Sequence, residues 1–189
     1  MTTTIRKPVV DVTIIGNQIE RLVPVRFIIH STETHDRAGL SDITGVLTYL
    51  KNTGKSGKAG DDPLGVHFCI DAEGHLGQGG HARWLMYGAA GANTGSIHCE
   101  LIGQARFIRA RWVMRKKQLE KLARLMAWTS TRYDIPLRWD VHHGFLTHKM
   151  ATDAFMNGQG HWDPGFGFPR WLVMRRAREI VKNHGWDKE

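Results

Sequence analysis

One segment indicates how the rest of the chain is organised: Leu146-Thr-His-Lys-Met-Ala-Thr-Asp-Ala-Phe-Met-Asn-Gly-Gln-Gly-His-Trp-Asp-Pro-Gly-Phe-Gly-Phe-Pro169. It contains His148, His161 and Asp163, and its glycines and prolines favour irregular backbone over regular helix or strand. A further imidazole, His30, ends an apolar run far upstream. Two neutral imidazoles and one carboxylate suit a catalytic zinc, because they leave the fourth tetrahedral position open for water.

The bulk composition predicts one globular domain. The chain has 189 residues, of which 41% are apolar and 23% charged, so it is long enough for one core and short for two. It contains no apolar run of the ~18–20 residues that a membrane-spanning helix needs, and we expect no membrane insertion. A net charge of +8 favours a polyanionic partner: nucleic acid, anionic lipid or an acidic cell-wall polymer. We expect a monomer.

Several β-branched and apolar runs predict strands. His30 lies where the predicted strand 23–30 ends, which is a usual position for site residues in α/β folds. In the predicted strand 96–102, alternation places Ile97 and Cys99 on one side and His98 and Glu100 on the other. A buried carboxylate is costly, so Glu100 must reach solvent or line a polar cleft. Further strands are predicted at residues 8–15 and 65–71, the latter followed by a turn and a return strand at 75–78.

Helical periodicity is clearest at residues 116–133, where an apolar stripe faces a charged one, and it also predicts helices at 41–52 and 169–183. Strands and helices mix without strict alternation. The fold class is therefore α/β, with a mixed central β-sheet and helices packed on it.

Four short motifs, in this order along the chain, resemble the zinc-dependent N-acetylmuramoyl-L-alanine amidase family, type 2. This family includes bacterial amidases, phage endolysin domains and peptidoglycan recognition proteins. The motifs are Phe27-Ile-Ile-His30-Ser-Thr, His67-Phe-Cys-Ile-Asp-Ala-Glu-Gly74, Asn93-Thr-Gly-Ser-Ile-His-Cys-Glu-Leu-Ile-Gly103, and Thr147-His148 followed by His161-Trp-Asp-Pro-Gly165. The resemblance covers about residues 23–171 and implies a single amidase catalytic domain over residues 1–189 with the peptidoglycan-recognition-like fold.

Carried over residue by residue, the resemblance places the zinc ligands on His30, His148 and Asp163, with one zinc ion per chain. It places the carboxylate near the reacting water on Glu100 and a cationic or hydrogen-bonding group on His161. Zinc would activate the water, Glu100 would move its proton to the leaving amine, and His161 would stabilise the oxyanion. The bond cleaved would be the amide between the lactyl group of N-acetylmuramic acid and L-alanine of the stem peptide.

Some assignments depart from the family pattern or stay open. Many members have lysine at the position of His161, some have cysteine at that of Asp163, and the glycine common within the third motif is His98 here. His142 or His143 could be the second ligand in place of His148, since they lie close by in the sequence.

Other residues are assigned with less support from the family pattern. Asn93 and Trp162 are candidate substrate contacts. The remaining histidines are interpreted as ordinary surface or packing residues: His35, His67, His75, His81 and His184.

The ending of the fourth motif is similar to amidase domains of phage lysins that act on actinobacterial, including mycobacterial, walls. The resemblance therefore implies host lysis, peptidoglycan as the partner, and no nucleic acid. The chain could be a domain excised from a larger modular lysin. Because the N-terminus lacks a signal-peptide core, we expect synthesis in the host cytoplasm and action on the wall after release.

Two other functions stay open at this point. One is a peptidoglycan-binding module of the same fold without catalysis. The other is a basic nuclease with a histidine–metal site, for which the net charge is suitable but no compact ββα pattern is evident.

Overall fold

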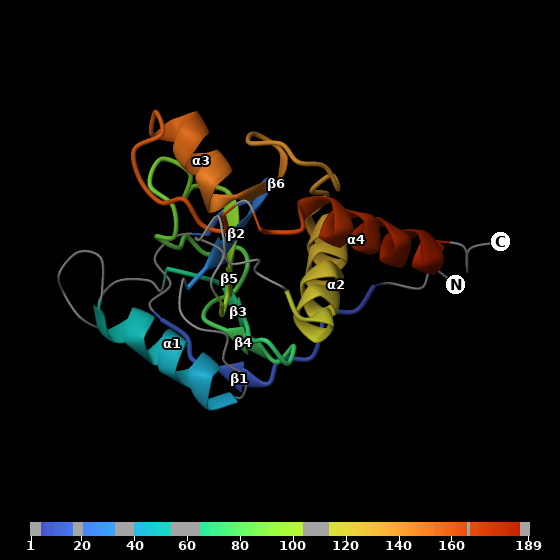
Figure 1. Cartoon of the computed structure of the whole chain (residues 1–189), viewed down its shortest axis with the longest axis horizontal. Coiled ribbons are helices and arrows are strands. Elements are labelled where there is room, and N and C mark those ends of the chain that lie inside the picture. Colours follow the sequence, from blue (N-terminus) through green and yellow to red (C-terminus); the bar gives the residue numbers. More distant parts are fainter. Residues whose placement is uncertain are drawn as a thin grey trace.

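The computed structural model describes residues 5–16, 21–32, 40–53, 65–103, 114–165 and 167–185, and its strands form one sheet (Figure 1). The strand order is β1-β4-β3-β5-β2-β6. Only β3 and β4 pair in antiparallel fashion, and all other neighbours are parallel. The strands are β1 (Val12–Thr13), β2 (Arg26–Ser31), β3 (Phe68–Ile70), β4 (Leu76–Gln78), β5 (Ser96–Leu101) and β6 (Gly144–Thr147). The mixed sheet predicted from the sequence is confirmed.

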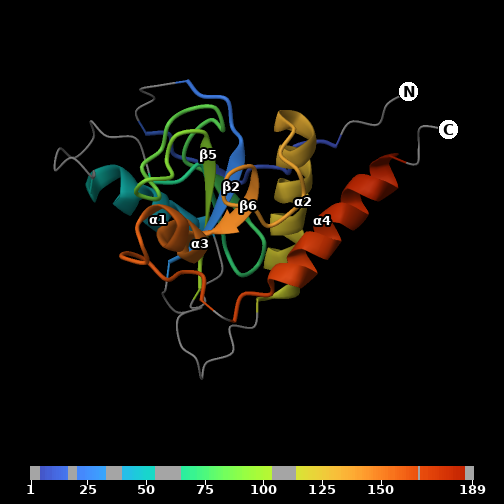
Figure 2. The ribbon, with the colours of Figure 1, turned by 90° about the horizontal axis from the view of Figure 1, so that it is seen from above.

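Helices cover both faces of this sheet. They are α1 (Leu40–Thr53), α2 (Lys116–Tyr133), α3 (His148–Phe155) and α4 (Arg170–Gly185). Figure 2 shows α1 and α3 on one side of the strands, and α2 and α4 on the other. The helices in the described parts of the chain are too short or too polar to cross a membrane.

The alternation of side chains along β2 decides which layer each residue enters. Phe27 and Ile29 are fully buried in the large core that includes Leu122 of α2 and residues of α4. Ile28 points the other way and packs with residues of β6 and α3. Burying each of these side chains contributes roughly 1.5–3 kcal/mol. His30 has the same parity as Ile28, so this packing directs its imidazole towards the face covered by α1 and α3.

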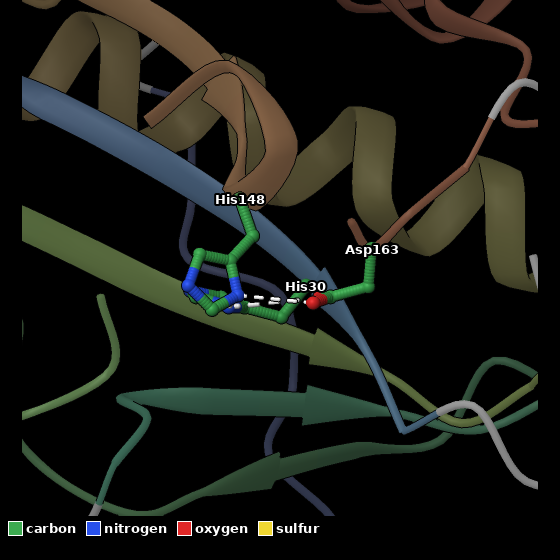
Figure 3. A group of neighbouring side chains, drawn as sticks. All are labelled: His30, His148 and Asp163. Carbon is green, nitrogen blue, oxygen red and sulfur yellow. Dashed lines mark hydrogen bonds and ion pairs between the residues drawn. The ribbon is translucent and has the colours of Figure 1, made fainter. Parts of the chain in front are cut away.

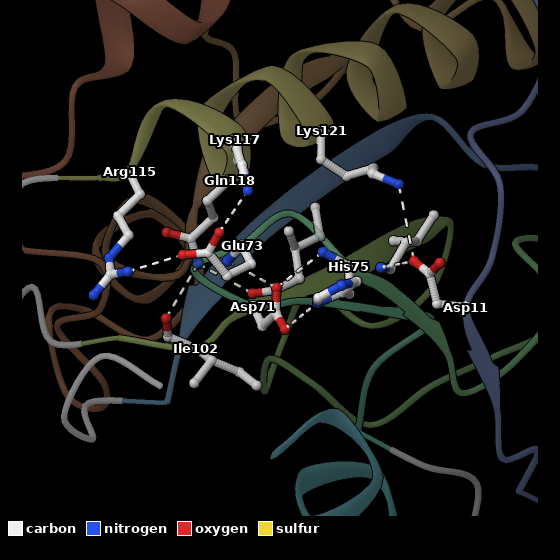
Figure 4. Close-up of polar contacts among 11 residues, drawn as sticks. Asp11, Asp71, Glu73, His75, Ile102, Arg115, Lys117, Gln118 and Lys121 are labelled. Atoms are coloured by element: carbon white, nitrogen blue, oxygen red, sulfur yellow. Dashed lines mark hydrogen bonds and ion pairs between the residues drawn. The ribbon is translucent and has the colours of Figure 1, made fainter. Parts of the chain in front are cut away.

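The β3–β4 hairpin is held by buried Asp71 (Figure 4). One carboxylate oxygen of Asp71 accepts hydrogen bonds from the backbone N–H groups of Glu73 and His75, at 3.0 and 2.9 Å. Its other oxygen lies 2.7 Å from Nδ1 of His75. Gly74 completes the turn with φ of +79°, and a Cβ there would lie 2.7 Å from the carbonyl oxygen of Lys117. Only glycine suits this position.

A second polar contact joins α2 to the ends of two strands. The side-chain amide of Gln118, which is 1% exposed, donates hydrogen bonds to the carbonyl oxygens of Ile70 and Ile102, both at 3.1 Å. Figure 4 shows the amide pointing from α2 towards Ile102. These bonds satisfy carbonyl groups at the point where β3 and β5 leave the sheet.

Two predictions about local structure are wrong. The segment that begins at Leu146 is not irregular throughout, because it completes β6 and then forms α3. The side chain of Thr147 caps this helix by accepting a hydrogen bond from the backbone N–H of Met150 at 3.2 Å. Threonine is a common N-cap residue, but the glycines that follow the helix in the sequence led to the prediction of irregular backbone. The strand predicted at residues 8–15 is only Val12–Thr13, since its partner β4 offers three residues.

Candidate metal centre

Three side chains predicted as ligands converge in the structure (Figure 3). His30, His148 and Asp163 are all buried, and one donor atom from each lies within 4.8 Å of the others. The Nδ1 atoms of His30 and His148 are 3.0 Å apart. Asp163 places Oδ1 3.0 Å from Nδ1 of His148 and Oδ2 3.8 Å from Nδ1 of His30.

Each of the three comes from a different element, at one end of the sheet. His30 is near the carboxyl end of β2, and His148 is the first residue of α3, directly after β6. Asp163 lies in the connection between α3 and α4, and both other segments hold it. The backbone N–H of Ser31 donates to Oδ2 of Asp163 at 2.9 Å, and the N–H of Lys149 donates to its carbonyl oxygen at 2.9 Å.

The surroundings of Asp163 keep its carboxylate ionised. Burial alone raises the pKa of this group, but the hydrogen bond with His148, the charges of His30 and His148 and the N–H of Ser31 together outweigh burial. The pKa of Asp163 is lowered from 3.8 to about 2. At neutral pH the cluster therefore offers one negative oxygen beside two imidazole nitrogens.

This donor set fits a divalent metal ion. Zinc binds histidine nitrogen and carboxylate oxygen at about 2.0–2.2 Å, which places neighbouring donors of a tetrahedron about 3.3 Å apart. The nitrogen–nitrogen distance of 3.0 Å and the nitrogen–oxygen distance of 3.0 Å need only small adjustments to reach that value. With three protein donors, one tetrahedral position remains for a reactant.

The cluster opens into a cavity of about 690 Å³, which is within the usual range for ligand sites. Helix α1 forms part of the cavity wall, through Asp42, Val46 and Tyr49. These wall residues were not predicted from the sequence. The sequence pattern that could have predicted them is their spacing of i, i+4 and i+7, which forms a second stripe on the helix beside the buried stripe of Ile43 and Leu47.

Both predicted catalytic residues line this cavity. Glu100 pairs with His30 in the register of β5 and β2, and both side chains lie on the same face of the sheet. The ring of His161 stacks on that of His148, with centroids 4.8 Å apart and an angle of 15° between the planes. Its side chain is 75% exposed, so His161 faces the solvent side of the ligand cluster.

The candidate substrate contacts lie outside the cavity lining. The side-chain oxygen of Asn93 accepts from the N–H of Ala89 at 2.7 Å and so closes a loop. Trp162 is 53% exposed, with the ammonium group of Lys149 lying 4.4 Å from its ring centre. Their contact with substrate stays a prediction.

The remaining histidines occupy different environments. His142 and His143 are exposed, and the ring of His143 lies 3.2 Å from the carbonyl oxygen of Asp134, so the structure brings His148 to the cluster in their place. Of the two environments predicted for His67, surface or packing, the structure shows packing, because the residue is fully buried. His35 lies outside the described residues.

The chain belongs to the N-acetylmuramoyl-L-alanine amidase family, whose sequence profile matches residues 21–166. Among curated protein sequences, none matches.

Several solved structures share the fold of this chain. The N-acetylmuramoyl-L-alanine amidase LysC of Clostridium intestinale is 17% identical, with a TM-score of 0.62 over 88% of this chain and 96% of that one. The hydrolase AmiA of Staphylococcus aureus is 15% identical, with a TM-score of 0.66 over 95% and 87%. The Drosophila peptidoglycan recognition protein SD is 18% identical, with a TM-score of 0.62 over 83% and 85%.

Proposed function

We propose that this protein is a zinc-dependent amidase that cleaves the bond between the lactyl group of N-acetylmuramic acid and L-alanine of the stem peptide. The observation that carries the proposal is the buried cluster of His30, His148 and Asp163, open to a cavity that also exposes Glu100 and His161. Membership in the amidase family supplies the substrate class.

In this mechanism, His30, His148 and Asp163 would hold the zinc ion. When bound, zinc supplies the Lewis acidity that activates water and polarises a carbonyl group. Glu100 accepts the proton of the attacking water and passes it to the leaving nitrogen, so that the products are a lactyl carboxylate and a free alanine amine. His161 donates an N–H to the oxygen on which negative charge develops.

We further propose that the reaction serves phage-induced lysis of an actinobacterial host. Synthesis would take place in the host cytoplasm, with action on the wall as monomer after release. Two observations support this setting: the His161-Trp-Asp-Pro-Gly165 ending, and the fold shared with LysCS of Clostridium intestinale, which is described as an endolysin. That protein is 16% identical, and its TM-score is 0.58.

A peptidoglycan-binding module without catalysis is the second candidate. It is favoured by the structural similarity to peptidoglycan recognition proteins, including the PGRP-LCa and PGRP-LCx ectodomains solved with tracheal cytotoxin. Against it, all three ligand positions are filled in this chain by residues that converge.

Digestion of purified mycobacterial peptidoglycan followed by mass analysis separates these candidates. The zinc-loaded protein is expected to release stem peptides with a new N-terminal alanine, whereas the His30→Ala variant is not. Binding to peptidoglycan without release would favour the module. New reducing sugar ends or cut cross-bridges would point to a different hydrolase.

A further inference from the structure

The side of His30 that faces away from the cluster contacts another histidine. Its Nδ1 belongs to the ligand group, while its Nε2 lies 3.0 Å from Nδ1 of His98 on β5. A single proton must lie between these two ring nitrogens. For Nδ1 of His30 to offer a lone pair to a metal while the ring is neutral, the proton must be on Nε2. Nε2–H of His30 then donates, and Nδ1 of His98 accepts.

His98 is fixed from behind by His67. The rings of the two residues stack with centroids 5.8 Å apart and 7° between their planes. The backbone N–H of His98 donates to Nδ1 of His67 at 2.9 Å, and Nε2 of His67 lies 2.8 Å from the carbonyl oxygen of Trp84. Because a backbone N–H can only donate, Nδ1 of His67 is the acceptor, and its Nε2–H donates a hydrogen bond to the carbonyl oxygen of Trp84.

A glycine makes room for this arrangement. A Cβ at Gly88 would lie 2.5 Å from Nδ1 of His98 and would also collide with the carbonyl oxygen of Gly65. The side of His98 that accepts from His30 is therefore packed directly against glycine backbone. His98 is completely buried, as is His67, so neither ring can reorient without disturbing its neighbours.

We propose that His98 is a positioning residue for the proposed metal ligand His30: by accepting a hydrogen bond from Nε2–H of His30, it fixes the tautomer and the ring orientation that present Nδ1 to the metal. The proposal rests on the metal centre proposed above. Partners that orient a ligand histidine in this way typically contribute 10–100-fold to metal affinity.

Two variants of equal size test the proposal. Asparagine and leucine have the same branched skeleton, but only His98→Asn offers an acceptor oxygen near the position of Nδ1. We expect His98→Leu to weaken zinc affinity by about 10–100-fold and His98→Asn to retain most of the affinity. Affinity is measured by competition with a chromophoric chelator, and the ligand geometry by the absorption spectrum of the cobalt-loaded protein. His142→Leu removes an exposed histidine and serves as the matched control.

The outcomes separate this inference from the proposed function. If the wild-type protein binds no zinc, the metal centre itself is wrong. If the wild type binds zinc and both His98 variants match it, or both lose affinity equally, the positioning role is wrong and the metal centre stands. Thermal unfolding of the metal-free proteins checks that both variants fold. Should they not fold, the ring ¹⁵N chemical shifts of His30 in the metal-free wild type must show the proton on Nε2, and a proton on Nδ1 would overturn the inference.

Discussion

Glu100 lies next to the three candidate metal ligands but outside their cluster. It pairs with His30 across two strands and lines the cavity, whereas the metal-ligand cluster among the described residues consists of His30, His148 and Asp163. A carboxylate placed in this way can exchange a proton with a reactant while the metal stays bound.

Replacing Glu100 with glutamine therefore separates proton transfer from metal binding. We expect the Glu100→Gln variant to keep its zinc content and to lose turnover by about 10²–10⁴-fold, the usual contribution of a general acid–base group. Metal analysis and release of stem peptides measure the two quantities. Loss of zinc from this variant would instead make Glu100 a ligand or a scaffold residue.

Buried His67 makes folding sensitive to acid. Burial lowers its pKa from 6.5 to about 4, partly offset by the hydrogen bond to the carbonyl of Trp84. Between these two pH values the unfolded chain binds a proton that the folded protein excludes, so the free energy of unfolding decreases as pH falls from 6.5 towards 4. The loss of stability reaches roughly 3 kcal/mol near pH 4, and it is absent well above pH 6.5.

Denaturant unfolding of the metal-free protein at several pH values measures this effect. Between pH 4 and 6.5, we expect the free energy of unfolding of the His67→Gln variant to depend less steeply on pH, by the amount that corresponds to about one proton bound on unfolding. His142→Gln, which changes an exposed histidine, should keep the wild-type slope. Equal slopes in all three proteins would contradict the buried neutral state of His67.

At the scale of elements, strong periodicity made some features predictable from the sequence. The apolar stripe of residues 116–133 predicted α2, whose observed bounds are Lys116–Tyr133. The end of an apolar run placed His30 at the carboxyl end of a strand, where β2 carries it. Both features depend on local patterns that tertiary contacts only reinforce.

Elements defined by long-range contacts were not predictable. β6 has four residues, and its identity as a strand depends on pairing with β2, far away in the sequence. The contact of His98 with His30 likewise depends on the register between β5 and β2. The alternation of side chains along the strand predicts on which face of the sheet His98 lies, but not which residue it contacts. The ligand set itself came from family resemblance, because spacing alone left His142 and His143 open.

The attachment of α2 to the sheet depends on Gln118. In the Gln118→Leu variant the carbonyl oxygen of Ile102 loses its amide donor in a buried position, whereas that of Ile70 keeps the N–H of Ile102. We expect the free energy of unfolding to fall by about 1–3 kcal/mol. Chemical denaturation measures this, with exposed Gln159→Leu as the control. Equal stability of the two variants would show that the buried amide contributes little.

At the scale of the whole molecule, zinc should stabilise the fold, because the three ligands lie together only when the sheet, α3 and the following loop are in place. Zinc at 100 times its dissociation constant is expected to add about 2.7 kcal/mol to the free energy of unfolding. Thermal unfolding with and without zinc measures this gain. His148→Ala should abolish the gain and His142→Ala should keep it. The reverse result would make His142 the ligand.

The sequence separation between the ligands also has a consequence for biosynthesis. Ser31, next to His30, is 132 positions before Asp163, whose carboxylate its backbone N–H holds. A nascent polypeptide on the ribosome therefore lacks the third candidate ligand until translation has passed Asp163 and the connection between α3 and α4 has folded. Metal binding at the proposed centre would therefore wait until Asp163 has been translated, and translation products that stop before it would lack the assembled centre.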